Sequence, residues 1–182
     1  GSNGSDSDEI LRLLAAAGYP RCRFSLHALQ VLPIRLHESD GRILLTCASN
    51  EIIDVLPPSS VLPTCFGLAF DIGTTTVVGY LLDLSTGQQR AVVSALNPQA
   101  TYGADVISRL TLALNDPQGL NQLSQAICTL LNDLTGQACR LAGISPQRIY
   151  EATVVGNTAM HHLFLGINPV GLAYAPYLPA IV

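Results

Sequence analysis

Residues 67–80 read Gly-Leu-Ala-Phe-Asp-Ile-Gly-Thr-Thr-Thr-Val-Val-Gly-Tyr, and this stretch decides how the rest of the chain is interpreted. Apolar runs at Gly67–Asp71 and Thr76–Asp83 flank a very short connection, so they are expected to pair as antiparallel strands. The turn between them holds one acidic residue, one glycine and three threonines: Asp71, Gly73, Thr74, Thr75 and Thr76. A polar turn of this kind between two buried strands indicates a binding site.

The chemistry of this turn favours a phosphate ligand. Asp71 ends a buried strand, where a carboxylate can hold Mg²⁺ or its waters. Gly73 lets the backbone turn tightly, and successive backbone N–H groups in such a turn can surround phosphate oxygens. The alternative is a plain hairpin turn in which Asp71 bonds the nearby backbone. Three threonines after the glycine, with an apolar strand on each side, favour phosphate.

The segments around this turn predict an α/β fold. A third strand is expected at Arg90–Ala95 and a fourth at Ile149–Val155. Helices are expected at Ala104–Leu114, from Asp116-Pro117 to Gly143, and from Gly156 to Gly166. The order β-β-β-α-α-β-α, a meander followed by a helical crossover, is that of a ribonuclease-H-like mixed sheet.

A small α+β domain is expected to precede this sheet. A helix is predicted at Asp8–Ala17, and Ser39-Asp40-Gly41 predicts a hairpin turn. The predicted short strands are Ile34–His37, Arg42–Thr46 and Glu51–Leu56. Residues 57–60, Pro-Pro-Ser-Ser, indicate a linker, and the domain boundary falls between about residues 57 and 66.

Two further motifs are candidates for binding. Gly156-Asn157-Thr158 joins a strand to a helix, where it could hold an anion or simply cap the helix. The segment from Asn97 to Arg109 is rich in Asn, Gln, Tyr and Gly, which is typical of a binding or docking loop. In the simpler interpretation, Asp105 stabilises the start of a helix and pairs with Arg109 one turn later.

The composition excludes several classes of protein. All 9 basic residues are arginines and no lysine is present, which excludes P-loop NTPases and Schiff-base enzymes. A net charge of −4 argues against a nucleic-acid partner. The 5 cysteines form no C-x-x-C pair, which argues against a zinc or iron–sulfur site and fits free thiols in the cytoplasm. No segment has the length and apolarity of a membrane span.

Part of the surface of this chain is expected to be covered by another protein segment or by a second copy of the chain. Only 12% of residues are charged, against about 25% in ordinary soluble domains. Residues 152–182 contain no Asp, Glu, Lys or Arg but several large apolar side chains. We expect this segment to be an interface and the isolated chain to self-associate as a homo-oligomer.

These motifs resemble a known family. Gly67–Tyr80 is similar to the first phosphate loop of the actin, sugar-kinase and heat-shock ATPase superfamily. The segments Asn97–Arg109, Val154–His161 and Ala175–Tyr177 look more specifically like the reductive activators of corrinoid proteins. Those are ferredoxin-like proteins whose C-terminal half is such an ATPase. The resemblance extends from Gly67 to about Tyr177.

The resemblance implies a function, a set of ligands and a set of site residues. Such activators use ATP to return an inactive Co(II) corrinoid protein of a methyltransferase system to Co(I), passing electrons through a [2Fe–2S] cluster. Carried over, the first phosphate loop consists of Asp71, Gly73, Thr74, Thr75 and Thr76, with Asp71 also serving Mg²⁺. Gly156, Asn157 and Thr158 would stand near the nucleotide. Asp105 would be a polar, potentially catalytic residue that faces the cleft or the partner.

The resemblance also implies a domain plan. Residues 1–9 would be a cloning remnant and disordered start, 10–62 a small α+β linker domain and 63–182 the first half of the ATPase domain. The cluster-binding cysteines and a second phosphate loop are absent, so we expect the chain to be a middle piece of a longer protein. The alternatives are a small-molecule kinase of the same superfamily and a non-catalytic interaction domain.

Overall fold

The computed structural model describes residues 4–59 and 62–181. The chain divides into two compact units, Gly1–Pro63 and Thr64–Val182, and each has its own hydrophobic core. Within the described residues, no helix is both long and apolar enough to cross a lipid bilayer.

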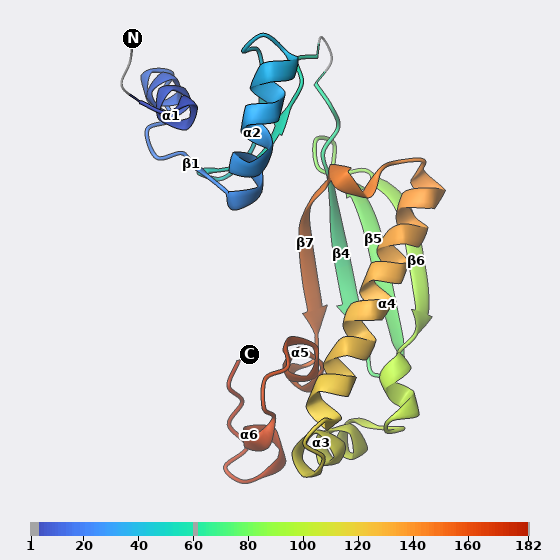
Figure 1. The fold of residues 1–182 in the computed structure, drawn as a ribbon. Helices are drawn as coiled ribbons and strands as arrows, with labels where there is room; N and C mark the ends of the chain where they lie inside the picture. Colours follow the sequence, from blue (N-terminus) through green and yellow to red (C-terminus); the bar gives the residue numbers. More distant parts are fainter. Residues whose placement is uncertain (1–3, 60–61, 182) are drawn as a thin grey trace. The chain divides into compact units, whose positions relative to one another are not determined.

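The first unit packs two helices with a small sheet (Figure 1). Its elements are α1 (Asp6–Ala16), β1 (Arg23–Phe24), α2 (Leu26–Glu38), β2 (Leu44–Ala48) and β3 (Glu51–Leu56). The sheet order is β1-β3-β2, with β1 parallel and β2 antiparallel to β3. Helix α1 begins inside the segment 1–9, for which a disordered start was expected, because Ser5 and Asp8 form a capping box. Residues 1–3 of that segment lie outside the described residues.

The predicted strand at Ile34–His37 is wrong, because these residues form the last turns of α2. Ser25 caps this helix, and Ala28 and Leu32, one turn apart, are buried with Ile52 and Val55 of β3. Packing of this apolar stripe against the sheet favours a helix. Ser39-Asp40-Gly41 ends the helix rather than joining two strands, with positive φ at Asp40 and Gly41.

The second unit contains a four-stranded mixed sheet. Its strands are β4 (Phe66–Ile72), β5 (Thr76–Asp83), β6 (Gln89–Leu96) and β7 (Ile149–Gly156), in the order β6-β5-β4-β7. Strands β4, β5 and β6 form an antiparallel meander, and β7 lies parallel to β4. The predicted ribonuclease-H-like order β-β-β-α-α-β-α is therefore confirmed.

The helices of this unit are α3 (Val106–Asn115), α4 (Gly119–Ala142), α5 (Thr158–Leu165) and the short α6 (Val170–Ala173). Two 3₁₀ turns, η1 (Pro98–Thr101) and η2 (Pro146–Arg148), complete it. Figure 1 shows the long helix α4 running across one face of the sheet. Helices α3 and α5 pack against α4, and α6 packs against α3.

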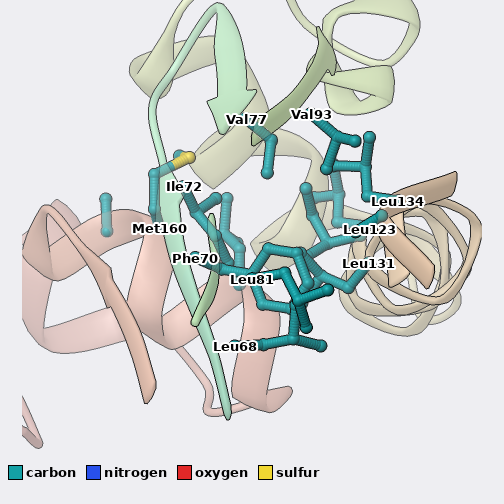
Figure 2. Packing of buried hydrophobic residues seen from close by; sticks show 14 of the residues in the cluster. Leu68, Phe70, Ile72, Val77, Leu81, Val93, Leu123, Leu131, Leu134 and Met160 are labelled. Carbon is teal, nitrogen blue, oxygen red and sulfur yellow. The ribbon is translucent and has the colours of Figure 1, made fainter. Parts of the chain in front are cut away.

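The core forms between α4 and the sheet (Figure 2). One stripe of α4 is fully or nearly fully buried: Leu123, Ile127, Leu131, Leu134 and Ala138. It meets alternate residues of the central strand β4: Leu68, Phe70 and Ile72. This alternation places Asp71, which lies between Phe70 and Ile72, on the opposite side of the strand. The core thus fixes the direction in which the Asp71 carboxylate points.

Candidate functional site

The two predicted phosphate-binding motifs lie side by side. Strands β4 and β7 are parallel, and their last residues, Ile72 and Gly156, are register partners. The turn after β4 and the start of α5 after β7 therefore meet at one edge of the sheet. Asn157 Nδ2 donates to Thr74 Oγ1 across this junction, at 3.4 Å. In open α/β sheets the carboxyl ends of strands are the usual place for a ligand.

The turn after β4 exposes hydrogen-bond donors. Gly73 N–H donates to Thr76 O at 3.0 Å and closes the turn, which leaves Thr74 and Thr75 at its tip. In the part of the chain that the structure describes, no acceptor takes the N–H groups of Thr74 and Thr75. A Cβ added at Gly73 would lie 2.6 Å from Thr76 O, so the turn requires glycine. These free donors are suited to an anion.

Asp71 is available for a cation. Its side chain is exposed, and no hydrogen bond or ion pair engages its carboxylate among the described residues. Residues 4–59 and 62–181 contain no group of three His, Cys, Asp or Glu side chains placed to hold a metal ion. A single carboxylate is nevertheless a normal protein contribution to Mg²⁺, which keeps several waters and takes phosphate oxygens. The site therefore fits a magnesium ion that arrives with a phosphate ligand.

The second motif, Gly156-Asn157-Thr158, is both a helix cap and part of the junction. Asn157 Oδ1 accepts from Met160 N at 3.0 Å, so its carbonyl oxygen caps α5 while its amide group reaches Thr74. A Cβ added at Gly156 would lie 3.0 Å from Ile72 O, which shows how closely the two strand ends approach. Thr158 is the first residue of α5. The capping and binding interpretations of this motif are thus compatible.

The carbonyl of Thr158 is held by a buried histidine. His162 is 1% exposed, and its Nδ1 lies 2.8 Å from Thr158 O. Its Nε2 accepts from Ala180 N at 3.1 Å, so Nδ1 carries the proton that is donated to Thr158 O. His162 thereby links the first turn of α5 to the segment that follows α6.

Asp105 caps its own helix. It is exposed and caps α3, accepting from Ser108 N at 2.7 Å while Ser108 Oγ accepts from Asp105 N. Hydrogen bonds from the backbone N–H and the hydroxyl of Ser108 lower the pKa of Asp105. Arg109 N donates to Asp105 O at 3.3 Å as part of the helix, but among the described residues no hydrogen bond or ion pair joins the Asp105 carboxylate to the side chain of Asp71 or Arg109. The carboxylate of Asp105 is therefore engaged with Ser108 rather than with the other site residues.

The expected pair between Asp105 and Arg109 does not form because Arg109 turns inward. Its side chain is 0% exposed, its Nε donates to Gly103 O at 2.8 Å and a terminal nitrogen lies 3.8 Å from Met160 Sδ. Burial lowers the pKa of Arg109, and the charge of Asp105 acts in the opposite direction. An arginine beside Leu110 and Ala113, which share its buried helix face, was the signal for this orientation.

Asn97 and Gln99 are two further polar residues whose burial the sequence did not predict. They are 1% and 0% exposed. Asn97 N and Nδ2 donate to Thr75 O and Gly73 O, both at 2.8 Å, and Gln99 Nε2 donates to Leu123 O at 3.0 Å. The Asn-Pro pair, typical of a helical turn, was the signal for a capping role of Asn97, whose Oδ1 accepts from Gln99 N. The start of the expected docking loop, Asn97, is thus hydrogen-bonded to the backbone of the turn Gly73–Thr76.

The antiparallel meander, the parallel fourth strand and the paired turns at the strand ends define the class of this unit. It is an α/β protein of the ribonuclease-H-like type. Comparisons with known proteins then identify its family.

The model of the RACo middle region family matches residues 66–182. The corrinoid activation enzyme RamQ of Eubacterium limosum is 41% identical over 141 residues, which are 78% of this chain and 24% of RamQ. A solved structure of a reductive activator for corrinoid, iron-sulfur protein is 32% identical, with a TM-score of 0.83 over 97% of this chain and 29% of that chain. The chain therefore belongs to the RACo middle region family, and the resemblance to reductive activators is confirmed. It spans less than a third of the length of either relative.

Proposed function

We propose that the full-length protein is an ATP-dependent reductive activator, and that this chain supplies one wall of its ATP site. The proposed reaction returns a corrinoid protein from Co(II) to Co(I). Membership of the RACo middle region family supports this proposal, as do the names of the similar proteins, a corrinoid activation enzyme and a reductive activator.

The observation that carries the ATP site is the meeting of the two turns. Free N–H groups at Thr74 and Thr75 stand beside the α5 N-terminus, which Asn157 joins to Thr74. The chain has no lysine to neutralise phosphate. Backbone N–H groups, threonine hydroxyls and a helix N-terminus supply positive potential in its place.

Each site residue has a proposed role. Gly73 allows the tight turn, the donors of Thr74, Thr75 and Thr76 bind phosphate oxygens, and Asp71 orients a magnesium ion through its waters. Gly156 permits close approach of the two turns, while Asn157 and Thr158 lie at the nucleotide. Asp105 is proposed as a polar residue that faces the cleft or the protein partner.

The full-length protein requires further groups and partners. ATP with Mg²⁺ supplies the free energy for an electron transfer that is otherwise uphill, and a [2Fe–2S] cluster elsewhere in the full-length protein supplies the electron. We propose the corrinoid protein of a methyltransferase system as the partner and the cytoplasm as the location. Residues 10–62, which lie within the first unit Gly1–Pro63, are proposed to be a linker domain.

Self-association is proposed through the apolar surface of α3 and the C-terminal segment. Tyr174, Tyr177 and Leu178 are 61%, 65% and 68% exposed. Tyr174 and Tyr177 border a groove of about 360 Å³ that α3 lines with Ile107 and Leu110. Val182, the last residue of the expected interface, lies outside the described residues. Apolar surface exposed in this way favours association.

Reactivation of a corrinoid protein tests the proposed function. The full-length protein is mixed with its corrinoid protein in the Co(II) state and a low-potential reductant, with and without Mg-ATP. We expect the absorption spectrum of Co(I) to form only with ATP, and Asp71→Asn to prevent it. Formation of Co(I) at the same rate without ATP would contradict the proposal. Transfer of the γ-phosphate to a small molecule would instead identify a kinase.

A further inference from the structure

The turn Gly73–Thr76, called the phosphate turn below, has two sides. The front is the side open to a ligand, and the back is the side that contacts Asn97. Its front carries the free N–H groups of Thr74 and Thr75. Its back carries the carbonyl oxygens of Gly73 and Thr75, and both accept hydrogen bonds from one residue. Asn97 donates its backbone N–H to Thr75 O and its side-chain Nδ2 to Gly73 O, each at 2.8 Å. A single residue, 22 positions from Thr75 and 24 from Gly73 in sequence, thus holds both carbonyls.

The direction of the Gly73 carbonyl determines the direction of one free donor, the N–H of Thr74. In a peptide unit the C=O and the following N–H point in opposite directions. The Gly73 carbonyl shares its peptide unit with Thr74 N–H, so fixing the oxygen at the back aims this N–H to the front. A turn whose carbonyls were free to rotate would lose part of its affinity for an anion, because the donors would have to be ordered on binding.

Asn97 is itself held in one orientation. It is 1% exposed, and its Oδ1 accepts from Gln99 N at 2.9 Å, which assigns the amide nitrogen to the side facing Gly73. The same nitrogen lies 3.8 Å from Met160 Sδ, and this sulfur also receives a contact from buried Arg109. Figure 2 shows Met160 beside Ile72, the residue before Gly73. Asn97 therefore contacts both the turn after β4 and Met160 in the first turn of α5.

We propose that Asn97 is a positioning residue of the ATP site, which holds the turn Gly73–Thr76 in its anion-binding form before the nucleotide arrives. This inference rests on the proposed function, because it takes Mg-ATP as the ligand of the turn. It assigns the start of the Asn97–Arg109 segment to support of the ATP site. Asn97 touches neither the proposed nucleotide nor the metal, and acts through the backbone of Gly73 and Thr75.

Substitutions in the full-length protein separate this role from a general effect on folding. Asn97→Asp keeps the shape and the acceptor toward Gln99 N but replaces the donor toward Gly73 O with an oxygen. Asn97→Ser is the milder variant should Asn97→Asp not fold. Gln99→Met is the matched control, since Gln99 is equally buried in the same segment but donates to Leu123 O of α4 rather than to the turn.

Two measurements are made on each variant. Calorimetric titration gives the Kd for Mg-ATP, and amide hydrogen exchange without nucleotide reports opening of the turn at Gly73, whose N–H donates to Thr76 O. We expect Asn97→Asp to raise the Kd at least about tenfold and to speed exchange at the Gly73 amide, because the turn opens more often without its anchor to Asn97. Gln99→Met is expected to leave the Kd within about twofold and exchange at the Gly73 amide unchanged, whatever it does to the Tm.

The outcomes distinguish this inference from the proposed function. Wild-type protein that binds Mg-ATP, with the Asn97 variants unchanged in Kd, overturns the inference and leaves the proposed function standing. Equal weakening by Gln99→Met also overturns it, because the effect would then belong to the whole segment. Wild-type protein that does not bind Mg-ATP overturns the proposed function, and the inference with it.

Discussion

The turn Gly73–Thr76 and the segment Asn97–Arg109 are both polar in sequence but have opposite orientations in the structure. Thr75 and Thr76 of the turn are exposed, whereas Asn97, Gln99 and Arg109 of the segment are buried. The turn offers donors to a ligand, and the segment donates to the backbone of the turn and to Gly103 and Leu123. A polar residue near a site can therefore either face a ligand or hold the protein backbone in place. Whether its side chain is exposed or buried distinguishes these two roles.

Loss of the Asp71 carboxylate is expected to have the largest effect on ATP hydrolysis. Asp71→Asn in the full-length protein should lower the rate of ATP hydrolysis at least about 100-fold, because it removes the anion nearest the magnesium ion. The Tm should stay within about a degree, since Asp71 is exposed and no hydrogen bond or ion pair holds it among the described residues. Steady-state ATPase assays and thermal melts check both parts. A lowered Tm with an unchanged rate would make Asp71 a structural residue.

A methyl group in the turn is expected to have the next largest effect. Gly73→Ala places a Cβ 2.6 Å from Thr76 O, so the turn must open. We expect the Kd for Mg-ATP to rise about tenfold, and we expect the free energy of unfolding of the second unit to fall by about 1–3 kcal/mol. Titration and urea denaturation measure the two effects. Gly136→Ala in α4, where an added Cβ comes no closer than 3.4 Å to Arg140, is the control and should not weaken binding.

Much of the fold around the turn Gly73–Thr76 could be predicted from the sequence. The strand pairs around residues 67–83 were predictable because a short turn between two apolar runs permits only antiparallel pairing. The apolar stripe of α4 and its end at Gly143, which has φ of 65°, were equally clear. The position of the turns Gly73–Thr76 and Gly156–Thr158 at the strand ends was predictable for the same reason, whereas phosphate binding there stays a prediction.

The burial of the polar side chains next to the turn could not be predicted. Asn97 and Arg109 are hydrophilic by type, and only the packing of α3, α4 and α5 around them decides that they are buried. The strand predicted at Ile34–His37 was wrong for a similar reason. The face of α2 that holds Ala28 and Leu32 packs on a sheet whose position depends on residues distant in sequence.

A smaller effect is expected at the junction of the two turns. In Gly156→Ala the new Cβ would lie 3.0 Å from Ile72 O and 3.4 Å from Met160 Cβ, so the strand ends must separate by a few tenths of an ångström. We expect a rise of about threefold in the Kd for Mg-ATP and a loss of about 1 kcal/mol in unfolding free energy. The same titrations test it. Binding that equals that of the wild type would show that the spacing of the turns is not critical.

The smallest effect is expected at Asp105, which caps α3 on the exposed side of the segment. Asp105→Ala should lower the Tm by a few degrees, and Asp105→Asn should restore it because Asn is an equally good cap. The pKa of Asp105 is lowered from 3.8, so its stabilisation is present above about pH 4 and is lost as the pH falls through the folded-state pKa. The difference in Tm between wild type and Asp105→Ala should therefore shrink in acid. An ATPase defect in the well-folded Asp105→Asn would instead support the proposed role at the cleft.

The central claim is that the two turns at the ends of β4 and β7 form one phosphate site. A crystal structure of the full-length protein with Mg²⁺ and a non-hydrolysable ATP analogue tests it most directly. We predict phosphate oxygens within hydrogen-bond distance of the N–H groups of Thr74 and Thr75, and a metal-bound water on the Asp71 carboxylate. A nucleotide bound elsewhere in the protein, with the turn Gly73–Thr76 free of phosphate, would contradict the claim.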